Sequence, residues 1–171
     1  MKSERRYVRI KLHSEVVLRD GMAPEEGVAV NISLGGMYVR ARNERPLGNE
    51  VEVEFILPPR KRIRTKAYIV RVVRHSDDKY PMGYGISFLK LPPEGKSEID
   101  SYVRNSYRAL RALYYELHRA SVNEKKVAEL VKISPIEHQY PQDILKEIVA
   151  SELSNLKLRP GKERRKTQPT E

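Results

Sequence analysis

The feature that most constrains the fold is a change of hydrophobic period at residues 92–95. Between residues 6 and 90, apolar and polar residues alternate in short runs such as "YVRIKL" and "NEVEVEF". A period of two is typical of half-buried strands, and short strands at this spacing favour a small antiparallel barrel. After Pro92-Pro93-Glu94-Gly95 the period becomes helical. The chain is therefore predicted to be an α+β protein in which a β-barrel precedes a helical region.

The sequence divides into three predicted parts. A barrel domain is expected over residues 1–94, a helical extension over 95–158 and a disordered basic tail over 159–171. The 171 residues are enough for one domain with an appendage. Within the extension, shorter amphipathic segments over 123–134 and 141–157 follow a long first helix. The tail is polar and has no periodicity, which is typical of a disordered segment.

The first helical segment carries an apolar stripe with alternating steps of four and three residues. Two arrangements would cover it: pairing with the same helix of another subunit, or folding back of residues 123–157 within one chain. We favour the first, because tyrosines widen the stripe, and expect a homo-oligomer held by residues 97–120. The stripe consists of Ile99, Val103, Ser106, Leu110, Leu113, Leu117 and Ala120.

Signatures of catalysis and of metal binding are missing. The sequence has no cysteine, no P-loop and no G-x-G-x-x-G motif. Ser33 lacks the G-x-S-x-G context of a nucleophile elbow. The four histidines lack the spacing of metal ligands; they are His13, His75, His118 and His138. We therefore expect no catalytic residue, no metal, no cofactor and no enzymatic activity.

The net charge of +10 indicates an anionic partner. One basic cluster is Arg5, Arg6, Arg9 and Lys11; the other is "RKRIRTK", residues 60–66. We interpret residues 60–66 as a solvated face that also protects the edge of a strand. The chain has no apolar run of about 18 residues, the length of a membrane span. The N-terminus lacks the apolar core of a secretory signal, so a cytoplasmic location is expected.

A polar turn interrupts the strand-like pattern at "VNISLGGMYVR", residues 30–40. Together with "RRYVR" at residues 5–9 and the later strand "GYGISF", this stretch resembles the PilZ domain family of cyclic di-GMP receptors. The family carries R-x-x-x-R, here Arg5 to Arg9, followed by [D/N]-x-S-x-x-G, here Asn31, Ser33 and Gly36. The resemblance covers roughly residues 4–91 and implies a six-stranded barrel.

The resemblance also implies a ligand site for cyclic di-GMP. It would be formed by Arg5, Arg6, Arg9, Asn31, Ser33, Gly35 and Gly36. Arginine pairs with phosphate and with the O6/N7 edge of guanine, and short polar side chains can bond a guanine edge. The two glycines allow positive φ and close approach of the backbone to the ligand. Asn31 stands where many members have Asp, so it keeps an acceptor but carries no charge.

Two other functions are weighed against this receptor. A nucleic-acid binder would use the basic face and the tail, but residues 60–66 have no interleaved aromatic residues, which disfavours this partner. A PilZ-like scaffold would bind no nucleotide and would act through its helices. For a receptor, residues 97–171 are expected to reach a downstream protein partner that the sequence does not identify.

Overall fold

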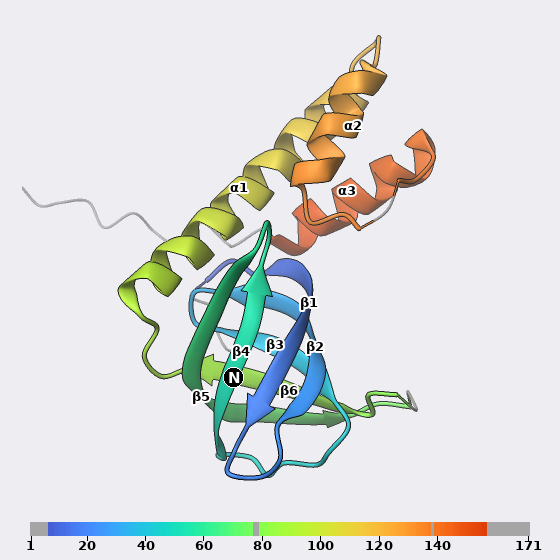
Figure 1. Ribbon diagram of the computed structural model, residues 1–171. Helices are drawn as coiled ribbons and strands as arrows, with labels where there is room; N and C mark the ends of the chain where they lie inside the picture. Colours follow the sequence, from blue (N-terminus) through green and yellow to red (C-terminus); the bar gives the residue numbers. More distant parts are fainter. Residues whose placement is uncertain (1–6, 77–78, 138, 157–171) are drawn as a thin grey trace, which may run out of the picture.

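Six antiparallel strands form a closed barrel in the computed structural model, which describes residues 7–76, 79–137 and 139–156 (Figure 1). This confirms the predicted six-stranded barrel, and the basic tail lies outside the described residues. The long basic segment after Pro59 is one strand, the longest of the six. The strands are β1 Ile10–Arg19, β2 Glu25–Ser33, β3 Gly36–Ala41, β4 Glu50–Leu57, β5 Lys61–Arg74 and β6 Met82–Phe88.

The barrel closes where β1 pairs with β4, giving the order β1-β2-β3-β6-β5-β4. Residues 60–66 therefore protect no edge, because β5 is paired on one side with β4 and on the other with β6. The expectation of edge protection was wrong, since a local pattern does not reveal the pairing of β1 with β4. A closed barrel has no free edge for charges to guard.

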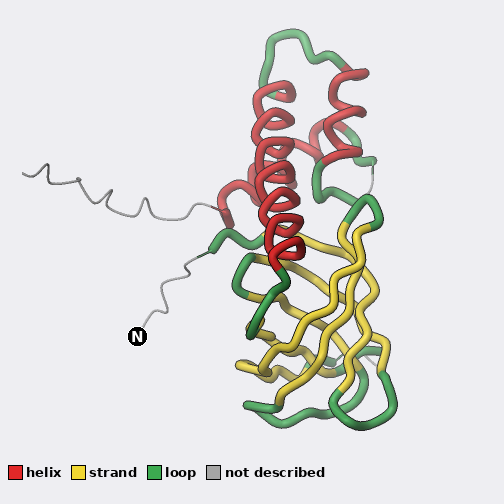
Figure 2. The backbone as a smooth tube through the Cα atoms, turned by 60° about the vertical axis from the view of Figure 1, so that its left-hand side comes forward, coloured by secondary structure: helices red, strands yellow, loops and turns green. Residues whose placement is uncertain are grey.

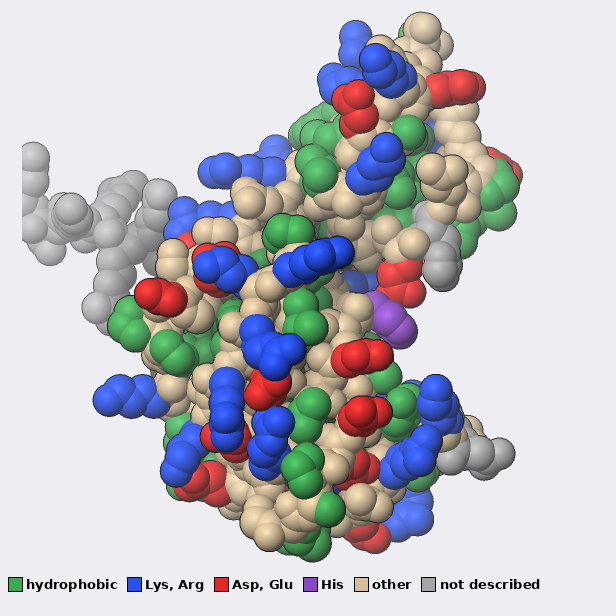
Figure 3. All heavy atoms as spheres, viewed as in Figure 1, with side chains coloured by type: hydrophobic (Ala, Val, Ile, Leu, Met, Phe, Trp, Pro, Cys, Tyr) green, Lys and Arg blue, Asp and Glu red, His purple; other side chains and the backbone are tan. Residues whose placement is uncertain are grey.

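The basic residues of β5 form a solvated face, as interpreted, and pair with the acidic residues of β4. Lysine and arginine side chains alternate with acidic ones on the face that β4 and β5 present in Figure 3. These exposed pairs contribute little stability each. They are Arg62–Glu54 at 3.2 Å, Arg64–Glu52 at 2.5 Å and Lys66–Glu50 at 3.1 Å.

The core lies inside the barrel and extends into the first helix. Phe55, Tyr84 and Ile86 contribute large buried side chains from β4 and β6, and Ile99 enters the same cluster from beyond the strands. Burying a side chain of this size stabilises the fold by about 1.5–3 kcal/mol. The barrel core therefore continues past residue 94, where the sequence alone places the boundary.

A buried ionic cluster closes the end of the barrel where β1 ends and β2 begins. Arg45 is 1% exposed. Its Nε donates to Asp20 Oδ2 at 2.8 Å, and its Nη1 contacts Glu25. Removing one partner would leave an uncompensated buried charge, which is strongly destabilising. This cluster is structural and lies at the end of the barrel opposite the polar turn of residues 30–40.

Three helices follow the barrel: α1 Pro93–Leu117, α2 Glu124–Ile133 and α3 Gln142–Leu156. α1 starts at one end of the barrel and extends beyond it, and α2 and α3 pack on its far half (Figures 1 and 2). Asn123 precedes α2 as its N-cap, and its side-chain oxygen accepts the N–H of Lys126 at 3.1 Å. Every helix in the described ranges is too short or too polar to cross a membrane.

The apolar stripe of α1 is covered within the chain. Ile99 packs in the barrel core, whereas Leu113 and Leu117 pack against α2 and α3 through Val131, Leu145 and Val149. Ala120 is exposed and follows the end of α1. The intramolecular alternative is therefore the one observed for the stripe. A homo-oligomer through residues 97–120 stays a prediction, but the stripe no longer supports it.

Candidate functional site

The polar turn joins β2 to β3 in a tight hairpin. Ser33 is the last residue of β2 and Gly36 the first of β3. The Ser33 hydroxyl is buried and donates to the Gly36 carbonyl at 3.2 Å. On the β6 side, the N–H of Phe88 donates to the Gly35 carbonyl at 3.0 Å. The turn is therefore held both by its own serine and by the end of β6.

The two glycines of the turn do not adopt positive φ. Only Gly21 and Gly48 do so among the described residues, so the positive φ that glycine allows is not used at Gly35 or Gly36. A Cβ on Gly36 would lie 1.9 Å from the carbonyl oxygen of Ile86. Position 36 therefore requires glycine because β6 approaches closely. A left-handed backbone conformation is not the reason.

The N-terminal arm reaches the turn through Tyr7. A Cβ on Gly35 would meet the Tyr7 ring at 2.9 Å from Cδ2 and 3.1 Å from Cε2. The ring, which is 47% exposed, therefore lies against the backbone of Gly35. Arg9 follows it as an exposed residue next to the start of β1. Arg5 and Arg6 lie outside the described residues.

Asn31 lies on the outer face of the barrel, because its neighbour Ile32 is buried in the core. Its register partners are Lys11 on β1 and Tyr38 on β3. The Oδ1 atom of Asn31 is buried and has no hydrogen-bond partner within the described part of the chain. A buried acceptor of this kind calls for a donor. Asn31 is therefore suited to accept an N–H group from a bound molecule.

Tyr38 and Lys11 flank Asn31. The sequence analysis missed Tyr38, and it placed Lys11 in the N-terminal basic cluster but not in the ligand site. The Tyr38 hydroxyl lies 2.7 Å from Nε2 of His75, and its ring occupies the space over Gly83 of β6. Both residues could have been found as the outward-facing cross-strand partners of Asn31. However, the register depends on strand pairing, which the motif does not specify.

α1 and α3 meet the start of β1 beside Asn31. The Tyr102 hydroxyl of α1 donates to the Lys11 carbonyl at 3.0 Å, and burial raises the pKa of this tyrosine, which keeps it neutral. Lys11 Nζ pairs with Glu152 of α3 at 2.6 Å. Two helices distant in sequence therefore contact the strand that lies next to the polar turn.

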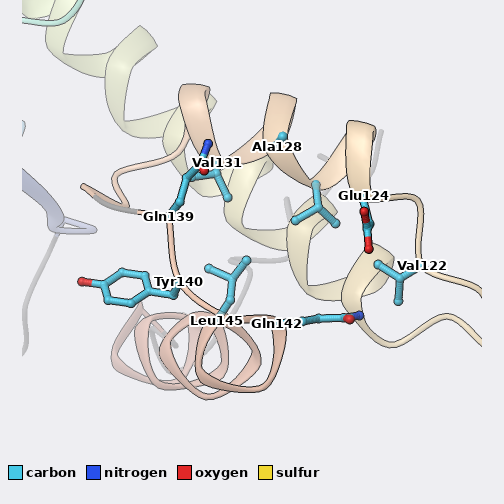
Figure 4. A pocket seen from close by; sticks show the side chains of 9 residues that line it. Val122, Glu124, Ala128, Val131, Gln139, Tyr140, Gln142 and Leu145 are labelled. Atoms are coloured by element: carbon cyan, nitrogen blue, oxygen red, sulfur yellow. The ribbon is translucent and has the colours of Figure 1, made fainter.

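A separate cavity of about 300 Å³ lies in the helical region (Figure 4). Valines, Ala128 and Leu145 form its apolar lining, and Glu124, Gln139, Gln142 and Tyr140 supply its polar groups. No lysine or arginine is among these lining residues, so the cavity lacks the charge that a phosphodiester requires. Across the described ranges, no three metal-binding side chains come together.

The fold and the turn together define a small closed-barrel domain whose polar turn, N-terminal arm and first helix meet at one end. The PilZ domain family model matches residues 3–105, which is more than half of the chain. The chain belongs to the PilZ domain family. No curated protein matches its sequence.

Two solved structures show the same fold. The inhibitor of motility MotI/DgrA of Bacillus subtilis aligns with a TM-score of 0.53 and 18% identity, over 58% of this chain and 49% of that one. YcgR of Escherichia coli, solved in complex with c-di-GMP, aligns with a TM-score of 0.53 and 18% identity, over 63% of this chain and 48% of that one. The chain therefore spans about half the length of each of these proteins.

Proposed function

We propose that the protein is a receptor for cyclic di-GMP and that it performs no catalysis. The contact that carries the proposal is the packing of the Tyr7 ring against Gly35, because it brings the arm with the R-x-x-x-R motif to the turn with the N-x-S-x-x-G motif. Membership of the PilZ family and the c-di-GMP complex of the similar YcgR support the choice of ligand.

In the proposed site, the arginines bind the charged and hydrogen-bonding edges of the ligand, and the turn binds a base. Arg5, Arg6 and Arg9 supply bidentate donors for phosphate and for the O6/N7 edge of guanine. The unpartnered Oδ1 of Asn31 would accept an N–H from a guanine base. Gly35 has no Cβ, so the Tyr7 ring packs directly against the turn and keeps the arm beside it.

Ser33 has a supporting role in this proposal. Its hydroxyl donates within the turn and is buried, so it fixes the turn that carries Gly35 and Gly36. Asn31 then presents its amide from a strand that is paired on both sides. A preorganised site loses less entropy when the ligand binds.

Signal transmission would pass from the turn to the helices. Lys11 is the register partner of Asn31 and contacts both Tyr102 of α1 and Glu152 of α3. An anionic ligand beside Asn31 would compete with Glu152 for Lys11 and so change how α3 is held. The helices would present this change to a downstream protein partner.

Isothermal titration with cyclic di-GMP tests the proposal, with single-stranded DNA of mixed sequence as the competing ligand. We expect saturable binding of cyclic di-GMP and none of DNA at moderate salt. Binding of DNA alone would support the nucleic-acid alternative, and binding of neither would support a scaffold that holds no nucleotide. Both outcomes would contradict the receptor.

A further inference from the structure

A hollow lies where α1 meets the tip of the β2–β3 turn. Its volume of about 400 Å³ is within the range of small-molecule sites. Five lining residues come from the first 12 residues of α1, and the sixth is Leu34 of the turn itself. The lining residues are Leu34, Pro93, Lys96, Ser97, Asp100 and Arg104.

The hollow and the arm flank consecutive residues of one turn. Leu34 lines the hollow, and the next residue, Gly35, lies against the Tyr7 ring. A ligand held between the arm and the turn would therefore lie next to the hollow. A cyclic dinucleotide carries two phosphates and two bases, so part of it would extend beyond the Tyr7 side of the turn.

The hollow contains two basic side chains and one acidic one. Lys96 is exposed. Arg104 is 66% exposed and pairs through Nη2 with Asp100, four residues earlier on α1. An exposed helical pair of this kind is weak and is screened by salt. Arg104 can therefore exchange the Asp100 carboxylate for a ligand phosphate, which it would bind in a bidentate manner.

We propose that Lys96 and Arg104 form a second anchor for the nucleotide, on the α1 side of the turn. This rests on the proposed function, because it assumes that the arm and the turn hold the other part of the same ligand. The ligand would then bridge the barrel and the first helix. Asp100 would act against binding by occupying Arg104 when the site is empty.

The test compares two double variants that each remove two positive charges. Lys96→Gln/Arg104→Gln removes the proposed anchor, whereas Lys125→Gln/Lys132→Gln changes exposed residues of α2, which do not line the hollow. Titration with cyclic di-GMP at low salt is expected to show about ten-fold weaker binding for the first variant and wild-type affinity for the second. The difference should shrink at high salt.

A third variant moves the affinity in the opposite direction. Asp100→Asn releases Arg104 and removes the negative charge, so it should bind about two- to five-fold more tightly at low salt. A role of Asp100 only in helix stability would not raise affinity. Thermal unfolding of all variants should match the wild type, because the changed side chains lie at the surface.

The outcomes separate this inference from the receptor itself. If wild type binds and the Lys96→Gln/Arg104→Gln variant binds as well as the α2 control, the second anchor is wrong and the receptor stands. An Asp100→Asn variant with unchanged or weaker affinity would also overturn the anchor. If wild type binds no cyclic di-GMP, the proposed function itself fails.

Discussion

The two adjacent glycines of the β2–β3 turn have different tasks. We expect Gly36→Ala to lower the free energy of unfolding by about 3 kcal/mol or more, because the new Cβ would lie 1.9 Å from the Ile86 carbonyl and β6 must shift. Gly35→Ala should change it by less than about 0.5 kcal/mol, because only the exposed Tyr7 ring must move. Chemical denaturation of both variants measures the difference, and equal losses would contradict it.

Ser33 is expected to act through the turn. Ser33→Ala removes the hydrogen bond to the Gly36 carbonyl and should cost about 0.5–1.5 kcal/mol of unfolding free energy. Affinity for cyclic di-GMP should fall by a similarly small amount. Ser97→Ala, at an exposed position of α1, serves as the control for unfolding. A loss of all binding with unchanged stability would instead make Ser33 a direct ligand contact.

At the level of single residues, the two motifs point to the turn of residues 31–36, whereas the contacts of its glycines come from strand pairing. Tyr7, which lies between the arginines of the first motif, packs against Gly35 of the second motif. The contact of Gly36 with Ile86 could not be predicted, because it depends on pairing between strands 50 residues apart in sequence. The same pairing brings Tyr38 over Gly83.

Among the elements, α1 joins the barrel core to the apolar cluster between the helices. Glu116 holds the end of α1 that is far from the barrel. The Glu116 carboxylate accepts from Lys126 at 3.0 Å, from Arg119 at 3.2 Å and from the Asn123 N–H at 3.3 Å. These interactions lower the pKa of Glu116 below its ordinary value of 4.5, and the hydrogen bond from Lys126 has the largest effect. The carboxylate thus stabilises the junction of α1 and α2 while it is ionised.

This junction should weaken in acid. Because the folded pKa of Glu116 is lowered, its contribution is complete above the unfolded value and is lost as the pH falls through the folded value. Melting curves followed by circular dichroism at about pH 6 and about pH 3 should show a smaller acid loss for Glu116→Gln than for wild type. Identical acid losses in the two proteins would contradict this role.

The helices were easier to predict than the strand pairings. Steps of three and four residues are a local signal, and the predicted helical segments 97–120, 123–134 and 141–157 lie close to the observed α1, α2 and α3. The role of residues 60–66 required knowledge of both neighbours of β5. Closure through β1 and β4 is a property of the whole sheet, so no local pattern reports it.

Considering the whole molecule, the apolar stripe of α1 packs on the barrel at one end and holds α2 and α3 at the other. Leu117 is fully buried among residues of α2 and α3. We expect Leu117→Ala to cost about 2–5 kcal/mol through the cavity it leaves. Light scattering should show that the molecular mass is the same for the variant and for wild type. Dissociation of a wild-type oligomer by this variant would restore the intersubunit role of the stripe.

The most direct test of the receptor is a titration of cyclic di-GMP into wild type and Arg9→Ala. Arg42→Ala is the matched control, because it removes an exposed arginine at the opposite end of the barrel. Losing a charged partner in a desolvated contact costs about 2–5 kcal/mol. We predict saturable binding for wild type and Arg42→Ala, no detectable binding for Arg9→Ala, and one melting temperature for all three. Equal affinity of Arg9→Ala and wild type would contradict the site.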